Sequence, residues 1–304
     1  MMTRPRILGF LKFICSGTIA AVLLQLLGSS PVQADLVFGT VKSSSNGFGF
    51  GSFDISNPTG SPGSYSYAWT SVLNNQSALA DLARDPNSGA MYLMFDPNGV
   101  KSYRSITTAG VMTSLGTPTD RVYSMAFENT TGELYAYAMT ATNIWQKLDE
   151  ASGSTLTSGS LTGAQTFPYS SFGGNMTGAA AGGFYFVSEF PQGQLVKITP
   201  AGVNASTVIT GTMTGSGFNA TKASIPFVSG TTLHVLNESR LYTVNEADAS
   251  LTLLGTVTGL PVTFTAFTGA VAPVTAVPEP STCCLALAGL ACGGYSVWRR
   301  RART

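Results

Sequence analysis

Leu82-Ala-Arg-Asp-Pro-Asn-Ser-Gly89-Ala-Met-Tyr92 has the pattern of an apolar strand, a polar turn with glycine and a second apolar strand. The same pattern recurs in Met125-Ala-Phe-Glu-Asn-Thr-Thr-Gly132-Glu-Leu-Tyr135. Weaker copies are Thr177–Phe186 and Ile225–Leu233. The turn glycines are spaced 43, 51 and 47 residues apart, at Gly89, Gly132, Gly183 and Gly230. Glycine adopts positive φ without a steric penalty, which hairpin turns require. The pattern predicts an internal repeat of β-hairpins.

A second motif follows each hairpin and consists of an apolar strand that runs into another turn. Its copies are Phe53–Gly60, Tyr103–Gly110, Trp145–Gly153 and Leu195–Gly202. A fifth copy, Leu241–Ala249, lacks the glycine. A last apolar strand closes each unit, for example Val111–Leu115 or Leu251–Leu254. Four strands in about 45 residues is the period of a β-propeller blade.

The two ends of the repeat region complement each other. Residues 36–72 supply only the later strands of a unit, beginning with Leu36–Val41, and the missing first strand is expected at Phe264–Val271. Pairing these two segments would close a ring of five blades without an open sheet edge. The predicted fold class is therefore all-β and propeller-like. A β-sandwich followed by a stalk is the alternative. A β-helix is disfavoured, because the period of about 45 residues is too long for one of its coils.

The repeats resemble degenerate propeller blades of secreted bacterial proteins. The residues that carry this resemblance are Asp85-Pro86 in one unit and Gly132-Glu133-Leu134-Tyr135 in the next. The resemblance implies a ring of four-stranded sheets around a central channel.

Composition limits what this body does. Of the 16 Lys and Arg residues, seven lie near the chain ends, and of the 15 Asp and Glu residues only Glu279 does, which leaves 9 against 14 and a net charge near −5. A nucleic-acid surface would be basic, so no nucleic-acid partner is expected. All four cysteines lie outside the body, at Cys15, Cys283, Cys284 and Cys292. The body therefore has neither disulfides nor a thiolate metal site.

The N-terminus predicts a signal peptide over residues 1–34. Basic residues precede an apolar segment, Phe13–Leu27, and Val32-Gln33-Ala34 has the small-x-small form of a cleavage site. Cleavage between Ala34 and Asp35 would export residues 35–272, the predicted propeller-like domain. An uncleaved anchor is the alternative.

The C-terminus has three parts. A linker, residues 273–281, contains Val277, Pro278, Glu279 and Pro280, whose prolines favour extended backbone. Residues 282–298 carry no charge and predict a transmembrane segment. Residues 299–304 form a basic cytoplasmic tail by the positive-inside tendency, with its charges on Arg299, Arg300, Arg301 and Arg303. A buried core helix with a basic end is the alternative.

This arrangement resembles the PEP-CTERM sorting signal of bacterial envelope and exopolysaccharide-associated proteins. The matching residues are Val277–Ser281, Leu285–Gly294, Trp298 and the arginines. The same tail is also known under an "ice-binding protein C-terminal" label. The resemblance implies recognition by an exosortase, and leaves open whether the tail is cleaved or stays as an anchor.

Catalytic signatures are weak in the body, and no catalytic residue is predicted. His234 lies in the apolar segment Thr232–Leu236, where a packed role is the ordinary one, and no G-x-S-x-G nucleophile elbow is present. A glycosidase would need paired carboxylates at the channel, and the expected inner strands offer Asp81 and, at a strand entrance, Asp120. Solvated loop acids are the alternative interpretation.

No metal or cofactor is predicted either. Asp96-Pro97-Asn98-Gly99 lacks the acidic series of a calcium loop and is better interpreted as a hairpin turn. No phosphate-binding glycine pattern stands between a strand and a helix. Threonine pairs such as Thr256 and Thr258 recur at no fixed offset, which argues against an ice-binding face. The six Asn-x-Ser/Thr sequons reflect polar turn composition, at Asn75, Asn129, Asn175, Asn204, Asn219 and Asn237.

The sequence therefore predicts an exported, exosortase-sorted protein of the cell envelope or extracellular matrix that is not an enzyme. One hypothesis is a binding module for extracellular polysaccharide, with Trp69, Tyr123 or Tyr169 stacking on sugars unless these rings are core residues. A degenerate carbohydrate-active enzyme is the alternative. A matrix component without a specific ligand is the third possibility. The expected partners are the exosortase, the secretion machinery and the membrane.

Overall fold

The computed structural model describes residues 35–43, 48–76, 80–95, 101–120, 122–138, 144–163, 174–188, 193–261 and 264–272. The chain divides into two units, Met1–Asp35 and Leu36–Thr304. All described strands belong to the second unit. The predicted signal peptide, linker, transmembrane segment and basic tail lie outside the described residues.

The strands of the second unit form antiparallel runs of four. The first run joins the two ends of the body and contains, in spatial order, β21 (Phe264–Val271), β1 (Leu36–Ser43), β2 (Phe48–Asp54) and β4 (Thr70–Gln76). The second contains β5 (Ala80–Arg84), β6 (Met91–Phe95), β7 (Ser102–Ile106) and β8 (Met112–Gly116). The third contains β9 (Val122–Phe127), β10 (Leu134–Ala138), β11 (Ile144–Leu148) and β12 (Thr155–Gly163).

Two further runs complete the described strands. The fourth contains β13 (Gly174–Gly178), β14 (Phe184–Ser188), β15 (Gln194–Ala201) and β16 (Asn204–Thr212). The fifth contains β17 (Ser224–Ser229), β18 (Thr232–Asn237), β19 (Arg240–Val244) and β20 (Leu251–Thr258). One short strand, β3 (Tyr65–Ala68), lies between β2 and β4 in the chain and pairs with β20 instead.

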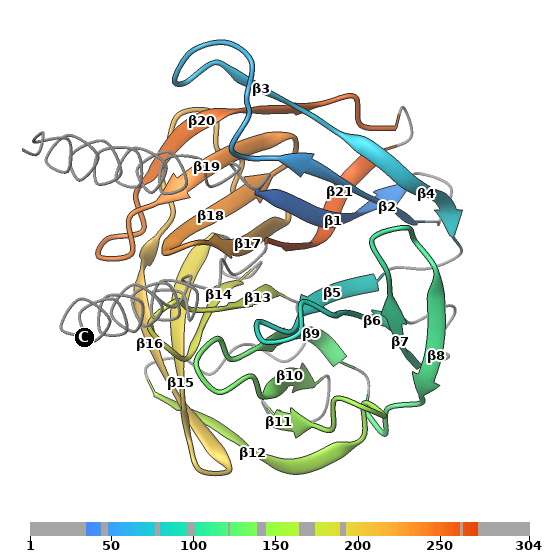
Figure 1. The fold of residues 1–304 in the computed structure, drawn as a ribbon. Helices are drawn as coiled ribbons and strands as arrows, with labels where there is room; N and C mark the ends of the chain where they lie inside the picture. The colour runs from blue at the N-terminus through green and yellow to red at the C-terminus, as the bar shows by residue number, and fades with distance from the viewer. Residues whose placement is uncertain are drawn as a thin grey trace, which may run out of the picture. The chain divides into compact units, whose positions relative to one another are not determined.

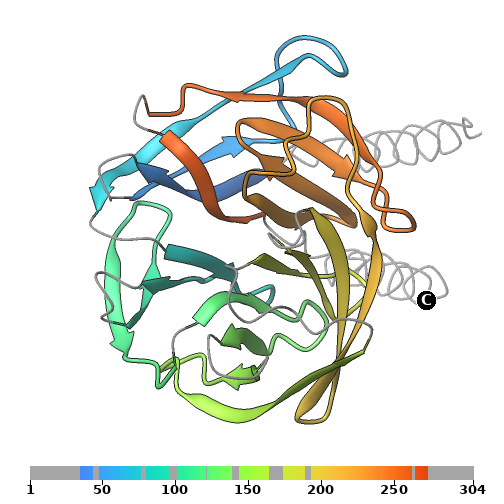
Figure 2. The ribbon, with the colours of Figure 1, turned by 180° about the vertical axis from the view of Figure 1, so that it is seen from behind.

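The first strands of the runs form a closed ring. Each contacts the next in cyclic order, from β21 to β5, β9, β13, β17 and back to β21. The later strands of each run extend outward from this ring, as both ribbon views show (Figures 1 and 2). This is the arrangement of a propeller, and the predicted all-β, propeller-like class is confirmed.

Burial follows from this geometry. The second strands β10 and β14 lie between neighbouring runs and are buried along their whole length. The outer strand β16 alternates between exposed and buried residues in its first half, because one face is open to solvent. The continuous apolar segments of the sequence are thus the strands covered on both faces.

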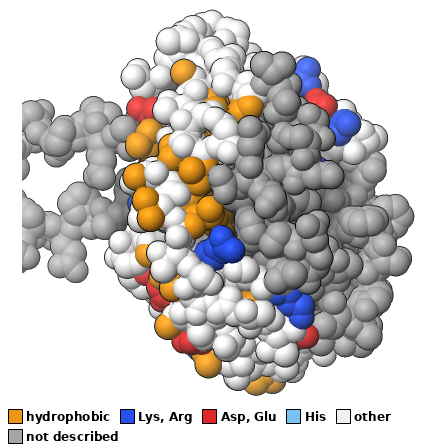
Figure 3. Space-filling model, turned by 90° about the vertical axis from the view of Figure 1, so that its right-hand side faces the viewer, with side chains coloured by type: hydrophobic (Ala, Val, Ile, Leu, Met, Phe, Trp, Pro, Cys, Tyr) orange, Lys and Arg blue, Asp and Glu red, His pale blue; other side chains and the backbone are white. Residues whose placement is uncertain are grey.

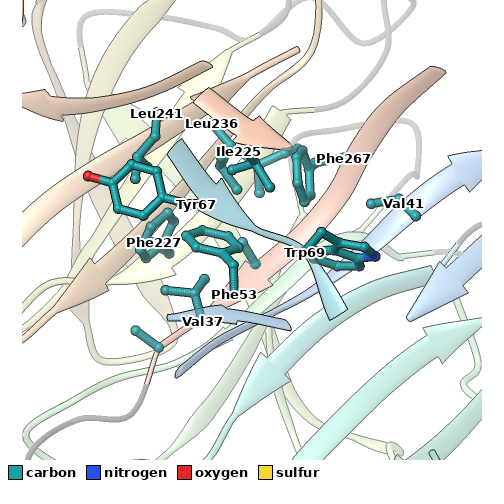
Figure 4. Packing of buried hydrophobic residues seen from close by; sticks show 13 residues of the cluster. Val37, Val41, Phe53, Tyr67, Trp69, Ile225, Phe227, Leu236, Leu241 and Phe267 are labelled. Carbon is teal, nitrogen blue, oxygen red and sulfur yellow. The ribbon is translucent and has the colours of Figure 1, made fainter. Parts of the chain in front are cut away.

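The hydrophobic core is divided among the seams between runs. Each of five buried clusters in the described residues combines side chains from two successive runs. Figure 4 shows the cluster between the fifth and first runs, where Phe53 packs edge-on against Phe227 with their ring centroids 6.5 Å apart. A two-layer sandwich would have one core between its two sheets. The alternative fold is therefore excluded by the packing.

The predicted turns form where the sequence places them. Gly89 and Gly132 have φ of 75° and 71°, and the glycines of the other motif copies also have positive φ. In the fifth copy of the second motif, Ala249 adopts φ 61° in place of a glycine. The turn is therefore kept there at a steric cost for the methyl group.

The predicted closure of the ring by the first and last strands of the body is confirmed. Strands β1 and β21 pair antiparallel, with Phe38 opposite Val271. Because the partners run in opposite directions, Leu36 and Ala272 lie at the same end of the ring.

Two parallel pairings were not predicted: β12 with β16 and β3 with β20. The first pairing merges the third and fourth runs into one eight-stranded sheet, and the second adds β3 to the fifth run. The number of separate blades therefore stays a prediction.

Candidate functional site

The axial opening of the ring is the candidate site. Residues from all five first strands or their ends line it: Leu82, Ala83, Arg84, Ala126, Phe127, Asn129, Met176, Thr177, Gly178, Val228, Ala270, Val271 and Ala272. Most of these side chains are small or apolar, and Arg84 is the charged one among them. The space that water can occupy is about 30 Å³, which is room for one or two water molecules. A sugar ring does not fit inside this opening.

Polar side chains recur at one position of the first strands. Asp81 on β5, Ser124 on β9 and Asn175 on β13 each lie eight residues before a turn glycine, and each bonds the next strand of the ring. The Met125 amide donates to Asp81 Oδ2 at 2.6 Å. The Met176 amide donates to Ser124 Oγ at 2.8 Å, and Asn175 Nδ2 donates to the Ser224 carbonyl at 3.4 Å.

Asp81 is the ionisable member of this set. Burial raises the pKa of Asp81 to about 7, although hydrogen bonds from the Met125 and Leu82 amides and from the Ser124 hydroxyl oppose the rise. Leu82 N donates to Asp81 Oδ1 at 2.9 Å. The sequence identified Asp81 but missed Ser124 and Asn175. The common spacing of eight residues to the turn glycine was the signal that could have found them.

Asp81 and Asp120 have different partners. Asp120 Oδ2 accepts a hydrogen bond from Gln146 Nε2 at 2.6 Å, and Gln146 is a buried residue of β11 in the same run. Asp81 accepts its bonds from the first strands of the ring. The hydrogen bonds of the described residues therefore do not bring the two carboxylates together as a catalytic pair.

His234 is a packed residue, as the sequence indicated. Its ring stacks on Phe227 with centroids 5.1 Å apart and an angle of 16° between the planes. It occupies the position on the second strand that is held by Tyr92, Tyr135 and Tyr185 in other runs, since His234 pairs with Phe227 as Tyr135 pairs with Ala126.

Those tyrosines bond carboxylates. Tyr92 Oη donates to Glu150 Oε1 at 2.5 Å, and Tyr185 Oη donates to Glu246 Oε2. In both pairs the carboxylate belongs to a turn of the next run. The pKa of each tyrosine is raised, mainly by burial and to a smaller extent by the hydrogen bond to the carboxylate. Each pair therefore joins two adjacent runs by a hydrogen bond from a neutral tyrosine hydroxyl to a glutamate side chain.

Glu128 also joins two runs. Its Oε1 accepts a hydrogen bond from the Gly183 amide of the next run at 2.8 Å, and its Oε2 accepts one from Thr131 N at 2.6 Å. Burial would raise the pKa of Glu128, but these bonds and one from the Thr130 hydroxyl outweigh burial and lower it. The carboxylate is held ionised by the fold and has a structural role.

Trp69 is part of the core and is not available to a sugar. Its side chain is 7% exposed, its Nε1 donates to Ser71 Oγ at 3.1 Å, and its ring packs edge-on against Phe267 (Figure 4). The hypothesis that Trp69 stacks on a sugar is therefore wrong, and core packing is its role. The Tyr123 side chain and Tyr169 lie outside the described residues.

The surface of the described residues offers little else. Four large apolar side chains are more than half exposed: Val111, Leu156, Val203 and Val208. Figure 3 shows one side face, where hydrophobic side chains gather beside residues that are not described. Among the described side chains no group of three or more His, Cys, Asp or Glu residues is placed to hold a metal ion. No helix in the described part of the chain is long and apolar enough to cross a membrane. The turn predicted at Asp96–Gly99 lies outside it.

Residues 276–301 match the PEP-CTERM protein-sorting motif. This confirms the resemblance noted for Val277–Pro280 and for Arg299, Arg300 and Arg301, whereas Arg303 lies beyond the matched residues. The motif indicates an exported protein with a C-terminal membrane-anchored sorting signal, and it implies processing by an exosortase. None of the curated proteins matches the sequence.

Several solved structures are similar in fold at low identity. The Malassezia sympodialis allergen Mala s 1 is 11% identical with a TM-score of 0.40, over 67% of this chain and 63% of that one. The Pseudomonas aeruginosa periplasmic gluconolactonase PpgL is 12% identical with a TM-score of 0.38, and the match covers 72% of this chain and 81% of PpgL. An auxiliary nutrient binding protein from Bacteroides thetaiotaomicron is 11% identical with a TM-score of 0.44, over 73% and 64%. The chain thus spans less than two thirds of the allergen. At this level of similarity the activities of these proteins say nothing about this one.

Proposed function

We propose that this chain is an exosortase-sorted protein of the cell envelope or extracellular matrix whose propeller-like body acts without catalysis, as a binding or structural module associated with exopolysaccharide. The observation that carries the proposal is the sorting motif at residues 276–301 on an all-β body. Both ends of the body lie on one side of the ring, because β1 pairs antiparallel with β21. The linker that carries the motif begins there.

The geometry of the axial opening supports the non-catalytic part. Its space for water is about 30 Å³, and its walls are mainly small and apolar side chains. Ligand sites for small molecules are usually about ten times larger. The Asp81 carboxyl bonds the neighbouring strand, and Asp120 bonds Gln146. A polymer would therefore be bound on an outer surface of the ring.

The sorting part is tested by replacing Pro278, Glu279 and Pro280 with alanine. Surface, membrane and medium fractions are then compared by mass spectrometry of both chain ends. We expect a wild-type product that starts at Asp35 and lacks the arginines, and a variant that keeps Thr304 and stays in the membrane. Replacing Pro273, Val274 and Thr275 with alanine is the matched control, because it changes the same linker outside the motif. A wild-type product that still ends at Thr304 would contradict processing.

The polysaccharide part is tested by sedimentation of the processed product with exopolysaccharide purified from the producing cells. We expect the product to sediment with the polymer and to remain in solution with a neutral glucan of similar size. Equal sedimentation with both polymers, or with neither, would contradict the association. Release of reducing sugars during the incubation would contradict the non-catalytic role.

A further inference from the structure

The two ends of the ring differ in charge. The tail end is the one that holds Leu36 and Ala272, from which the linker to the sorting motif continues. The last residues of the first strands line one axial opening, so these strands all run toward the tail end. Because each run is antiparallel, the turns after the first and third strands lie at the tail end. The connections after the second and fourth strands lie at the opposite end, the far end.

Acidic side chains gather at the tail end. Tyrosine hydroxyls at the beginnings of second strands bond Glu150 and Glu246, which holds the outer turns at this end. Among the described residues, the basic side chains here are Arg84 and Lys147. Eight of the eleven described acidic residues of the second unit lie in or beside these turns: Asp54, Asp85, Glu128, Glu133, Asp149, Glu150, Glu246 and Asp248. An anionic polymer is therefore repelled from the tail end.

Basic side chains gather at the far end. Five of the eight described basic residues lie there, and together they are named the basic arc: Lys42, Lys101, Arg104, Lys222 and Arg240. They belong to the fifth, first and second runs, which are neighbours in the ring (Figure 1) because β21 contacts both β17 and β5. Lys and Arg side chains are positively charged at neutral pH. The basic arc thus extends over three successive runs.

Neutral groups position the basic side chains of the second run. Lys101 precedes β7, and its Nζ donates a hydrogen bond to the Thr119 carbonyl. Arg104 Nε donates to Ser102 Oγ at 3.1 Å, which directs the guanidinium toward the beginning of β7. Two positive charges are therefore held at the far end of this run.

The fifth run contributes Lys222, which is exposed, and Arg240 at the beginning of β19. Arg240 Nη1 donates to the Gly217 carbonyl at 2.9 Å and to Glu238 Oε2 at 3.4 Å. The side chains of this ion pair are 42% and 37% exposed. An exposed pair is weak, so an external anion competes for Arg240.

The described acidic residues of the far end have partners within the chain. They are Asp81, Asp120 and Glu238. Asp81 accepts a bond from the first strand of the next run, Asp120 accepts one from Gln146, and Glu238 accepts the bond just described. Five basic residues thus stand against three acidic ones at this end.

The two ends act separately on a charged polymer. The shortest first strands have five residues, and at about 3.3 Å per residue they separate the ends by about 16 Å or more. Salt at about 0.1 M screens charges over about 10 Å. A polymer at the far end therefore interacts with the basic arc, although the body as a whole has a negative net charge.

We propose that the far end binds an acidic polysaccharide, a polymer that carries carboxylate or sulfate groups along its length. The inference rests on the proposed association with exopolysaccharide, and it names the class of polymer and the surface that binds it. A polymer contacts basic residues in several runs at once, so weak individual contacts add up. Binding at the far end also keeps the polymer away from the linker and its sorting motif.

Binding of the mature protein, purified from the producing cells, to polygalacturonate tests the proposal. Methyl-esterified polygalacturonate is the matched control polymer, because it has the same backbone without the charges. In about 0.1 M salt we expect the dissociation constant for polygalacturonate to be lower by about tenfold or more, and to rise as salt is added. Equal affinity for the two polymers would overturn the proposal.

Two pairs of substitutions locate the surface. Lys101→Gln with Lys222→Gln removes two charges from the basic arc and should weaken polygalacturonate binding by about threefold or more. Lys147→Gln with Lys197→Gln removes the same charge from the tail end and from β15, and should leave the affinity unchanged. Equal losses in the two pairs would overturn the proposal, because net charge alone would then decide binding.

Glu238→Gln changes the affinity in the opposite direction, which a loss of folding cannot imitate. It removes an acidic group beside the basic arc and should strengthen polygalacturonate binding by about twofold. The inference and the proposed function can fail separately. A protein that sediments with the exopolysaccharide of the producing cells but binds both forms of polygalacturonate equally keeps the proposed function and lacks the acidic-polymer site. A protein that prefers polygalacturonate but does not sediment with the exopolysaccharide has the site and lacks the proposed association.

Discussion

Asn237 shows how one buried side chain orders a long connection between two runs. It is fully buried, its Oδ1 accepts from Asn219 N at 2.9 Å, and its Nδ2 donates to the Asn219 carbonyl at 3.1 Å and to Ser224 Oγ at 3.0 Å. The segment between β16 and β17 is therefore fixed to β18 by one residue. In the sequence, Asn237 stands out only as part of a sequon.

We expect Asn237→Ala to lower the free energy of unfolding by about 2–4 kcal/mol, because the variant leaves several buried polar groups without their partner. Urea unfolding measures the change. Asn204→Ala is the matched control, since exposed Asn204 only accepts a bond from Ser160 N at 2.9 Å, and its loss costs about 1 kcal/mol or less. Equal effects of the two substitutions would show that burial of Asn237 is unimportant.

Asp81 gives the stability a specific dependence on pH. Its pKa is about 7 in the folded chain, above the ordinary value of 3.8, so between these values the folded state binds more protons than the unfolded state. Its contribution to stability is therefore complete below about pH 4 and falls by at most about 1.4 kcal/mol per pH unit up to about pH 7. Urea unfolding of wild type and Asp81→Asn at several pH values gives the difference. A difference that is constant from pH 4 to pH 8 would contradict the raised pKa.

At the scale of the element, two turn glycines allow the cost of a left-handed backbone to be distinguished from the cost of crowding a neighbouring side chain. Gly202 and Gly153 have φ of 66° and 70°. A Cβ at Gly202 would meet nothing within 4 Å, whereas one at Gly153 would collide with the buried ring of Tyr103. The two positions belong to equivalent turns, β15–β16 and β11–β12.

We expect Gly202→Ala to cost about 1 kcal/mol, the penalty of the left-handed conformation alone. Gly153→Ala should cost about 2–4 kcal/mol, because the Tyr103 ring must also move. Thermal unfolding of both variants under identical conditions makes the comparison. A cost of Gly202→Ala as large as that of Gly153→Ala would show that packing at Tyr103 is not the additional cause.

The elements show where sequence patterns suffice. Strand pairs around Gly89 and Gly132 follow from local apolar patterns and turn glycines, and both were predicted. Strand β3 was missed, because four residues within a segment rich in Gly, Pro and Ser carry little periodicity and their partner, β20, is about 190 residues away in the chain. The bonds of Ser124 and Asn175 were missed for a related reason: a polar residue within a strand shows its partner only when neighbouring runs are placed.

At the scale of the whole molecule, stability is shared among the seams. Each described cluster of the core belongs to two successive runs, so no run buries its own side chains alone. Strand β21 contributes Phe267 and Ala270 to the cluster between the fifth and first runs. It also contacts β1, β5 and β17. The ring therefore depends on its last strand.

We expect a chain that ends at Pro261 to lose the cooperative unfolding transition, because β1, β5 and β17 lose their common neighbour. A chain that ends at Ala272 keeps β21 and should unfold as one transition. Limited proteolysis and circular dichroism during urea unfolding distinguish the two. A cooperative transition in the shorter chain would show that the other four runs form a stable unit without closure.

The pairing of β1 with β21 also sets an order of events during export. In a chain that is exported from its N-terminus, Leu36 crosses the membrane before Val271, yet both residues belong to the same sheet. Until the last strand has crossed, the edge of β1 that pairs with β21 stays open to wrong pairing. Contacts between residues so distant in sequence also form slowly. An interrupted passage that stops before Val271 therefore leaves an unfinished ring on the outer side, rather than a smaller folded one.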